Sequence, residues 1–172
     1  ATQQLDNGAT PDEIITYMIA NDVQGLPNRR QYGIAAFVNG SPQTAAHTGS
    51  NKDPYTGHIL GPNYAIQGNI LSGQPILDSM EVRFLREPGD LACKLMAALQ
   101  GANTVGADSR CAANGSSSLF AYVKVSQQTD AFGSPSLVVG VRTRENAGIE
   151  PIDSLQSKFN VVQSCGTSHI DE

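Results

Sequence analysis

Apolar residues recur at helical spacing in several segments of the chain, and residues that start and stop helices flank these segments. The first segment is the clearest. Thr10 can cap a helix, Pro11 suits the first helical position, and Glu13 can close a capping box, which predicts a helix over 10–22. The same reasoning predicts three further helices, over 75–87, 90–100 and 151–159.

Runs rich in β-branched and aromatic residues predict strands between these helices. Residues 31–38 form one such run and lead into Asn39-Gly40, the strongest short hairpin motif, so 44–47 is predicted as the return strand. Turn-forming residues crowd 51–62, where we expect a loop. Further strands are predicted over 64–69, 118–125 and 136–142.

This order of elements favours an α+β fold, with an antiparallel sheet layer covered by helices, over a doubly wound parallel sheet. The sequence has no internal repeat and no long linker, and 172 residues are enough to bury one substantial core. We therefore expect a single domain over 1–162. Residues 163–172 show no periodicity, and we expect a mobile tail there.

Composition narrows the classes of function. The net charge is −5, and the one dense basic pair is Arg29-Arg30, so the sequence shows no basic patch of the kind that binds nucleic acid. No apolar run is long enough to span a bilayer, and we expect a soluble protein. The cysteines and histidines lack the spacing of a structural zinc site, and no cofactor is expected.

The three cysteines leave two interpretations open. Cys93 is predicted on a helix and Cys111 in the loop after it, so a disulfide between them would close a short loop worth about 3 kcal/mol and leave Cys165 odd. That pairing suits a secreted or periplasmic protein. The alternative is three buried free thiols in a cytoplasmic protein.

Four blocks of the sequence occur in the same order as in a known bacterial family. They are His-Thr-Gly at 47–49, a block over 63–73 that contains Gln67-Gly68-Asn69, the helical segment 91–99, and Gly-Ala-Asp-Ser-Arg at 106–110. On these blocks, from about residue 10 to 159, the chain resembles a domain of unknown function that is classed with the N-terminal-nucleophile (Ntn) hydrolases.

The resemblance implies a four-layered αββα sandwich and attack on an amide by a Thr, Ser or Cys at the start of the opening strand. The family's opening strands have no counterpart here, and Thr2 lies behind Ala1, so it lacks the free α-amine that serves as the base. We therefore expect this chain alone to be inactive. We expect its sheet to be completed by a missing N-terminal segment of the same protein or by a neighbouring subunit, as in a homo-oligomer.

The resemblance also places the block around Asn69 beside the expected cleft. The Asn69 amide could donate to a developing oxyanion, with Gln67 and Gly68 as binding positions, although Asn69 could equally satisfy a turn and Gln67 face water. His47 ends the hairpin strand and could act as acid or base, or as a structural donor. We expect His47 to approach Asn69, with His47 and Asn69 as catalytic candidates.

Binding residues are also predicted in two loops. Thr48 and Gly49 follow His47, at the end of the hairpin. Asp108 and Arg110, two positions apart, can form a bidentate pair that either braces the loop or binds a carboxylate-bearing ligand.

Two functions follow from the sequence. The first is an Ntn-hydrolase-like domain, either an amide-bond hydrolase or its inactive relative, whose nucleophile is not in this chain. The second is a non-catalytic secreted structural or filament-forming subunit.

Overall fold

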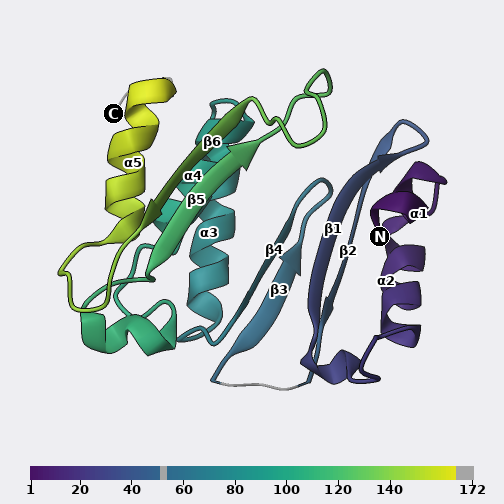
Figure 1. Ribbon diagram of the computed structural model, residues 1–172, viewed down its shortest axis with the longest axis horizontal. Helices are drawn as coiled ribbons and strands as arrows, with labels where there is room; N and C mark the ends of the chain where they lie inside the picture. The colour runs from purple at the N-terminus through teal and green to yellow at the C-terminus, as the bar shows by residue number, and fades with distance from the viewer. Residues whose placement is uncertain (51–53, 166–172) are drawn as a thin grey trace. The chain divides into compact units, whose positions relative to one another are not determined.

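A computed structural model describes residues 1–50 and 54–165. The chain forms two compact units, Ala1–Leu77 and Asp78–Glu172, and each is described by itself below. Both units combine helices with antiparallel strand pairs, so the α+β class is confirmed (Figure 1). The boundary between the units falls within helix α3 (Gln74–Arg86).

The first unit begins with a short helix, α1 (Thr2–Asp6), that the sequence pattern did not predict. The predicted first helix follows as α2 (Pro11–Ala20), and its capping box forms as expected: the Glu13 amide donates to Thr10 Oγ1 at 3.3 Å, and the Thr10 amide donates to Glu13 Oε2 at 2.8 Å. Ile14 and Ile15 are buried. Helix α2 packs against the hairpin that comes next, so these side chains anchor it there.

Two antiparallel hairpins complete the first unit. In the first, β1 (Gln31–Val38) pairs with β2 (Ser41–Thr48) through a turn in which Asn39 and Gly40 have φ values of 52° and 77°. In the second, β3 (Thr56–Leu60) pairs with β4 (Ala65–Asn69). The predicted loop over 51–62 was wrong for 56–60, which form β3. Turn-forming residues on either side favoured a loop, but pairing with β4 provides the hydrogen bonds that make this segment a strand.

The two hairpins stack as layers, with α2 on the far side of the first (Figure 1). Side chains at alternating positions of β1 and β2 reach the second hairpin: Thr44 Oγ1 donates to the Gly61 carbonyl at 2.7 Å, and Gln31 Nε2 donates to the Gly68 carbonyl at 3.0 Å. The intervening positions face α2, and Ala45 among them is buried. The first unit is therefore a helix–sheet–sheet stack.

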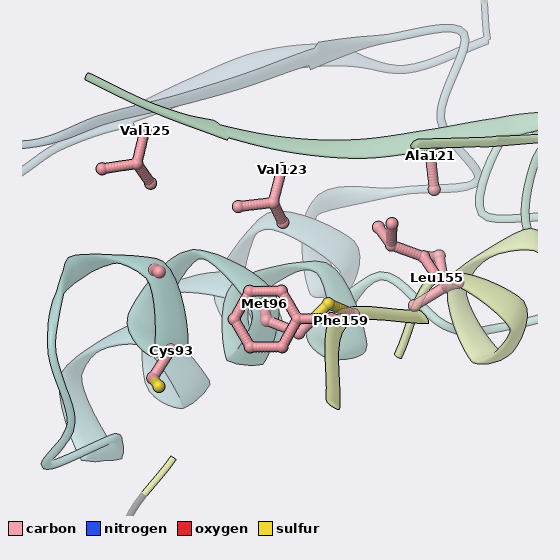
Figure 2. Packing of buried hydrophobic residues seen from close by; sticks show 9 residues of the cluster. Cys93, Met96, Ala121, Val123, Val125, Leu155 and Phe159 are labelled. Atoms are coloured by element: carbon pink, nitrogen blue, oxygen red, sulfur yellow. The ribbon is translucent and has the colours of Figure 1, made fainter. Parts of the chain in front are cut away.

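The second unit packs helices on one face of a third hairpin. The alternation of buried and exposed residues in β5 (Phe120–Val125) puts three residues of that strand into the core, where they meet side chains of the covering helices (Figure 2). The elements are the end of α3, α4 (Leu91–Gly101), the 3-10 helix η2 (Ser109–Asn114), β5 (Phe120–Val125), β6 (Leu137–Arg142) and α5 (Pro151–Val162). The buried cluster consists of Ala92, Cys93, Met96, Ala121, Val123, Val125, Ile152, Leu155 and Phe159.

A carboxylate fixes the start of α5. Glu150 caps this helix by accepting from the Ile152 amide at 3.0 Å, and the same carboxylate accepts from the Ser117 amide at 2.7 Å and from Ser117 Oγ at 2.5 Å. Ser117 is almost fully buried. The turn before β5 is thus held to the beginning of α5 by the two hydrogen bonds that Ser117 donates to Glu150.

The predicted Cys93–Cys111 disulfide was wrong. Cys93 is bonded to Cys165, with 5.7 Å between their Cα atoms, and Cys111 is a buried free thiol. The physical reason is that the chain after α5 returns to the beginning of α4, where Gln163 Nε2 also donates to Asp90 Oδ2 at 2.8 Å. Within the tail expected to be mobile, residues 163–165 are therefore tied down, and 166–172 lie outside the described residues.

Candidate functional site

A polar cleft of about 450 Å³ lies at one end of the stacked hairpins of the first unit. It forms where β1 and β3 begin and where β2 and β4 end, so residues at or next to four strand ends line it together with the connection before β1. Three of the predicted site residues line it, namely Gly49, Gln67 and Asn69. Among the described residues, the lining consists of Asn28, Arg29, Arg30, Gln31, Gly49, Thr56, Gln67, Asn69 and Ile70.

Gln31 organises this end of the stack. Its Nε2 atom donates to the carbonyls of Gly57 and Gly68, at 2.9 and 3.0 Å, and lies 3.1 Å from Thr48 Oγ1. Its Oε1 atom is the acceptor for Asn69 Nδ2 at 3.4 Å. One carboxamide from the first hairpin therefore binds both strands of the second and orients Asn69. Sequence reasoning missed Gln31, which is the first residue of a strand and belongs to no motif.

Two glycines let polar groups approach the strands closely. A Cβ atom at Gly49 would lie 2.1 Å from the Asn28 carbonyl oxygen, and one at Gly33 would lie 2.0 Å from Gln67 Oε1. The Gly49 amide also donates to the Arg30 carbonyl at 2.8 Å. The predicted position Gly49 thus has a steric reason, since any side chain there would push the 28–30 segment away from the cleft.

The backbone is strained at the cleft wall. Ile70 has a φ of 58°, in the left-handed region that a β-branched residue rarely adopts. Such a conformation costs on the order of 1–3 kcal/mol and persists only where the surroundings impose it. Here the next residue is fixed, because the Leu71 amide donates to the Tyr55 carbonyl at 3.0 Å. Strained residues of this kind cluster at functional sites.

The two arginines of the cleft differ in their partners. Arg30 Nε donates to Asp22 Oδ2 at 2.6 Å, and its Nη2 donates to Gln24 Oε1 at 2.8 Å. The Arg30 guanidinium and the Leu26 amide hold the pKa of Asp22 well below its usual range. Arg29 is exposed and has no ion pair within the described part of the chain. Among the described residues of the cleft, it is therefore the cation that remains for a ligand.

His47 does not join this cleft. Its Nε2 lies 2.8 Å from the Pro27 carbonyl oxygen, and its ring lies 6.1 Å from that of Tyr32, its partner across the ladder. The neighbouring pair, Gln31 and Thr48, points to the opposite face, toward the second hairpin and Asn69. The expected approach of His47 to Asn69 was wrong, because consecutive strand residues face opposite sides.

The other predicted residues of this unit contribute indirectly. Gly68 presents its carbonyl to Gln31, and the Thr48 hydroxyl lies 2.8 Å from His58 Nδ1. His58 was not among the predicted site residues. The signal that could have found it is its register, because His58 faces Gln67 across the β3–β4 ladder, but that pairing required β3 to be recognised as a strand.

Asp108 and Arg110 form the expected bidentate pair in the second unit. Arg110 Nε donates to Asp108 Oδ1 at 2.9 Å and Nη2 to Oδ2 at 2.6 Å, and Arg110 lowers the pKa of Asp108. Asp108 also caps η2. The pair lines a hollow of about 420 Å³ that includes Cys111, whose pKa is raised by burial. This geometry braces the loop and makes Cys111 a poor nucleophile.

No group of three His, Cys, Asp or Glu side chains that could hold a metal ion occurs in residues 1–50 and 54–165. In the same described ranges, every helix is too short or too polar to cross a membrane.

Comparison with known proteins gives a family and a fold. The profile of a family of unknown function, DUF1028, matches residues 1–140. A crystal structure of a DUF1028 protein from Silicibacter pomeroyi superposes with a TM-score of 0.65 at 19% sequence identity. The superposition covers 94% of this chain and 64% of the other, so the chain spans less than two thirds of that relative. None of the curated proteins matches the sequence.

Proposed function

This chain belongs to DUF1028, a family of unknown function, and we propose that its first unit binds a small molecule carrying both an amide and a carboxylate. The observation that carries this proposal is the composition of the polar cleft. Gln67 and Asn69 present carboxamides, which can donate and accept at once and so complement an amide. Arg29, which has no ion pair in the described residues, offers a guanidinium suited to a carboxylate.

The reaction proposed for such a ligand is hydrolysis of its amide bond, as in the Ntn hydrolases that the chain resembles, or binding alone in an inactive relative. The helix–sheet–sheet stack of the first unit supports the αββα arrangement. The exposed Asn69 carboxamide, held by Gln31, supports a role as oxyanion donor. None of the described residues that line the cleft is a His, Asp or Glu, so these residues are better suited to recognition than to proton transfer.

A structural subunit is the second candidate function. Each sheet in the described residues has two strands, and a two-stranded sheet has free edges that can pair with a neighbouring chain. This supports completion of the sheets by another segment or by a second subunit. The Cys93–Cys165 disulfide favours an oxidising compartment, and we propose a secreted or periplasmic location. Light scattering and electron microscopy of the purified protein would detect an oligomer or filament.

The ligand proposal is tested by calorimetric titration with N-acetylglycine, which carries the amide and the carboxylate together. Its methyl ester retains the amide and lacks the charge. We expect N-acetylglycine to bind, and Arg29→Ala to weaken it roughly tenfold, the equivalent of about 1.4 kcal/mol, while the ester is little affected. Arg86→Ala, at the exposed end of α3, is the matched control. Equal affinities in Arg29→Ala and Arg86→Ala would refute a carboxylate site at Arg29.

A further inference from the structure

We infer that Thr48 and His58 form a nucleophile–base pair beside the polar cleft, able to accept an acyl group from an ester or amide. The inference rests on the proposed function for the position of the substrate, since Gln31, which lines the cleft, has its Nε2 atom 3.1 Å from Thr48 Oγ1. The primary observation is the distance of 2.8 Å between Thr48 Oγ1 and His58 Nδ1. A hydroxyl in hydrogen-bond contact with an imidazole is the arrangement that activates serine and threonine nucleophiles.

The chemistry requires one tautomer of His58. Gln31 Nε2 carries two hydrogens, and the carbonyls of Gly57 and Gly68 accept both, so Gln31 does not decide which atom donates between Thr48 and His58. The reactive form of the pair is the tautomer in which His58 Nδ1 carries no hydrogen, because only then can the Thr48 hydroxyl donate to it.

The pair is held in place from both hairpins. Gln31 Nε2 donates to the carbonyls of Gly57 and Gly68, at 2.9 and 3.0 Å. Gly57 and Gly68 face one another across the β3–β4 ladder, and the next pair of that ladder is His58 and Gln67. Thr48 is only partly buried and His58 is exposed, so an acyl group can approach the hydroxyl. Asn69 belongs to the same network, because its Nδ2 atom donates to Gln31 Oε1 at 3.4 Å.

The reaction proceeds in two balanced steps. Thr48 Oγ1 attacks the acyl carbon while its proton passes to His58 Nδ1, and the bond from that carbon to the leaving oxygen or nitrogen breaks as the leaving group takes the proton. Water then attacks the acyl-threonine and gives a proton to His58. That proton returns to Thr48 as the acyl–oxygen bond breaks, which releases a carboxylic acid.

The probe is p-nitrophenyl acetate, with acylation located by mass spectrometry of proteolytic peptides. We expect one acetyl group on the peptide that contains Thr48, retained in Thr48→Ser and lost in Thr48→Val. His58→Gln should slow acylation by about 100-fold or more, in line with the loss of a general base. Thr44→Val removes another hydroxyl of β2, one that donates to Gly61 and does not touch the pair, and should acylate at the wild-type rate.

The result that would overturn the inference is acetylation confined to other residues, or an equal rate in Thr48→Val and wild type. Circular dichroism of each variant verifies that it is folded. The two tests are separable. If N-acetylglycine binds but acylation fails, the Thr48–His58 pair is refuted and the proposed function stands. If acylation occurs without any Arg29-dependent binding, the pair stands and the proposed function is refuted.

Discussion

Removing the Cys93–Cys165 disulfide should destabilise the second unit, and the size of the effect follows from the chain it closes. The bond spans 72 residues, and a chain-entropy estimate for a loop of that length gives about 4 kcal/mol. Cys165 is exposed whereas Cys93 is buried in the core, so Cys165→Ala removes the cross-link with little loss of packing. For a protein of this size we expect the melting temperature to fall by roughly 10 °C.

The assay is thermal denaturation with and without reductant, together with peptide mapping of the oxidised protein. Reductant should lower the melting temperature of wild type to that of Cys165→Ala and leave that variant unchanged. Cys111→Ala is the matched control, because its thiol is free, and it should keep its sensitivity to reductant. A cross-linked peptide joining Cys93 to Cys111, or a melting temperature that ignores reductant, would refute the reasoning.

Three further predictions concern single polar side chains. Gln31→Met should lower the free energy of unfolding by about 1–3 kcal/mol in urea denaturation, since it leaves two carbonyls of the second hairpin without their donor, and an unchanged midpoint would contradict this. Asp22→Asn should be less stable than wild type at pH 7. The pKa of Asp22 is lowered on folding, so the stabilisation by this carboxylate is present above its usual pKa and is lost as pH falls below about 4. If wild type and Asp22→Asn differed in melting temperature by the same amount at pH 7 and pH 3, the ion pair with Arg30 would be excluded as the source of the difference. Glu150→Ala should cost about 2–3 kcal/mol by releasing Ser117 and the α5 cap, and Glu150→Gln, which keeps an acceptor oxygen, should lose less; equal losses would show that hydrogen bonding by this side chain is not the cause.

Local patterns predicted the elements whose stability is decided locally. The capping box at Thr10 set the start of α2, and Asn39-Gly40 set the turn of the first hairpin, because both act through residues next to one another in sequence. Strand β3 escaped prediction since it is five residues long and gains its hydrogen bonds from β4. Its recognition required a pairing partner, which propensity does not provide.

The candidate site was predicted in part for the same reason. Gly49, Gln67 and Asn69 belong to recognisable blocks, and they do line the cleft. Gln31 and His58 carry no motif, and their positions depend on how two hairpins stack. The prediction of the cysteine pairing failed because it depends on contacts between residues still farther apart in sequence. Cys93 and Cys165 are brought together by the packing of α5 and the return of the chain to α4.

The Gln67 side chain, which lines the cleft, lies directly against Gly33. A substitution at position 33 on β1 can therefore change the shape of the cleft. A methyl group at position 33 would meet the tip of a flexible side chain, not backbone, so the chain can accommodate it by moving the Gln67 carboxamide. Positions 33 and 67 should therefore vary together among relatives, with a larger residue on β1 accompanied by a shorter one on β4. For an engineer, the same pair offers a way to change which ligands fit while leaving the hydrogen bonds of Gln31 in place.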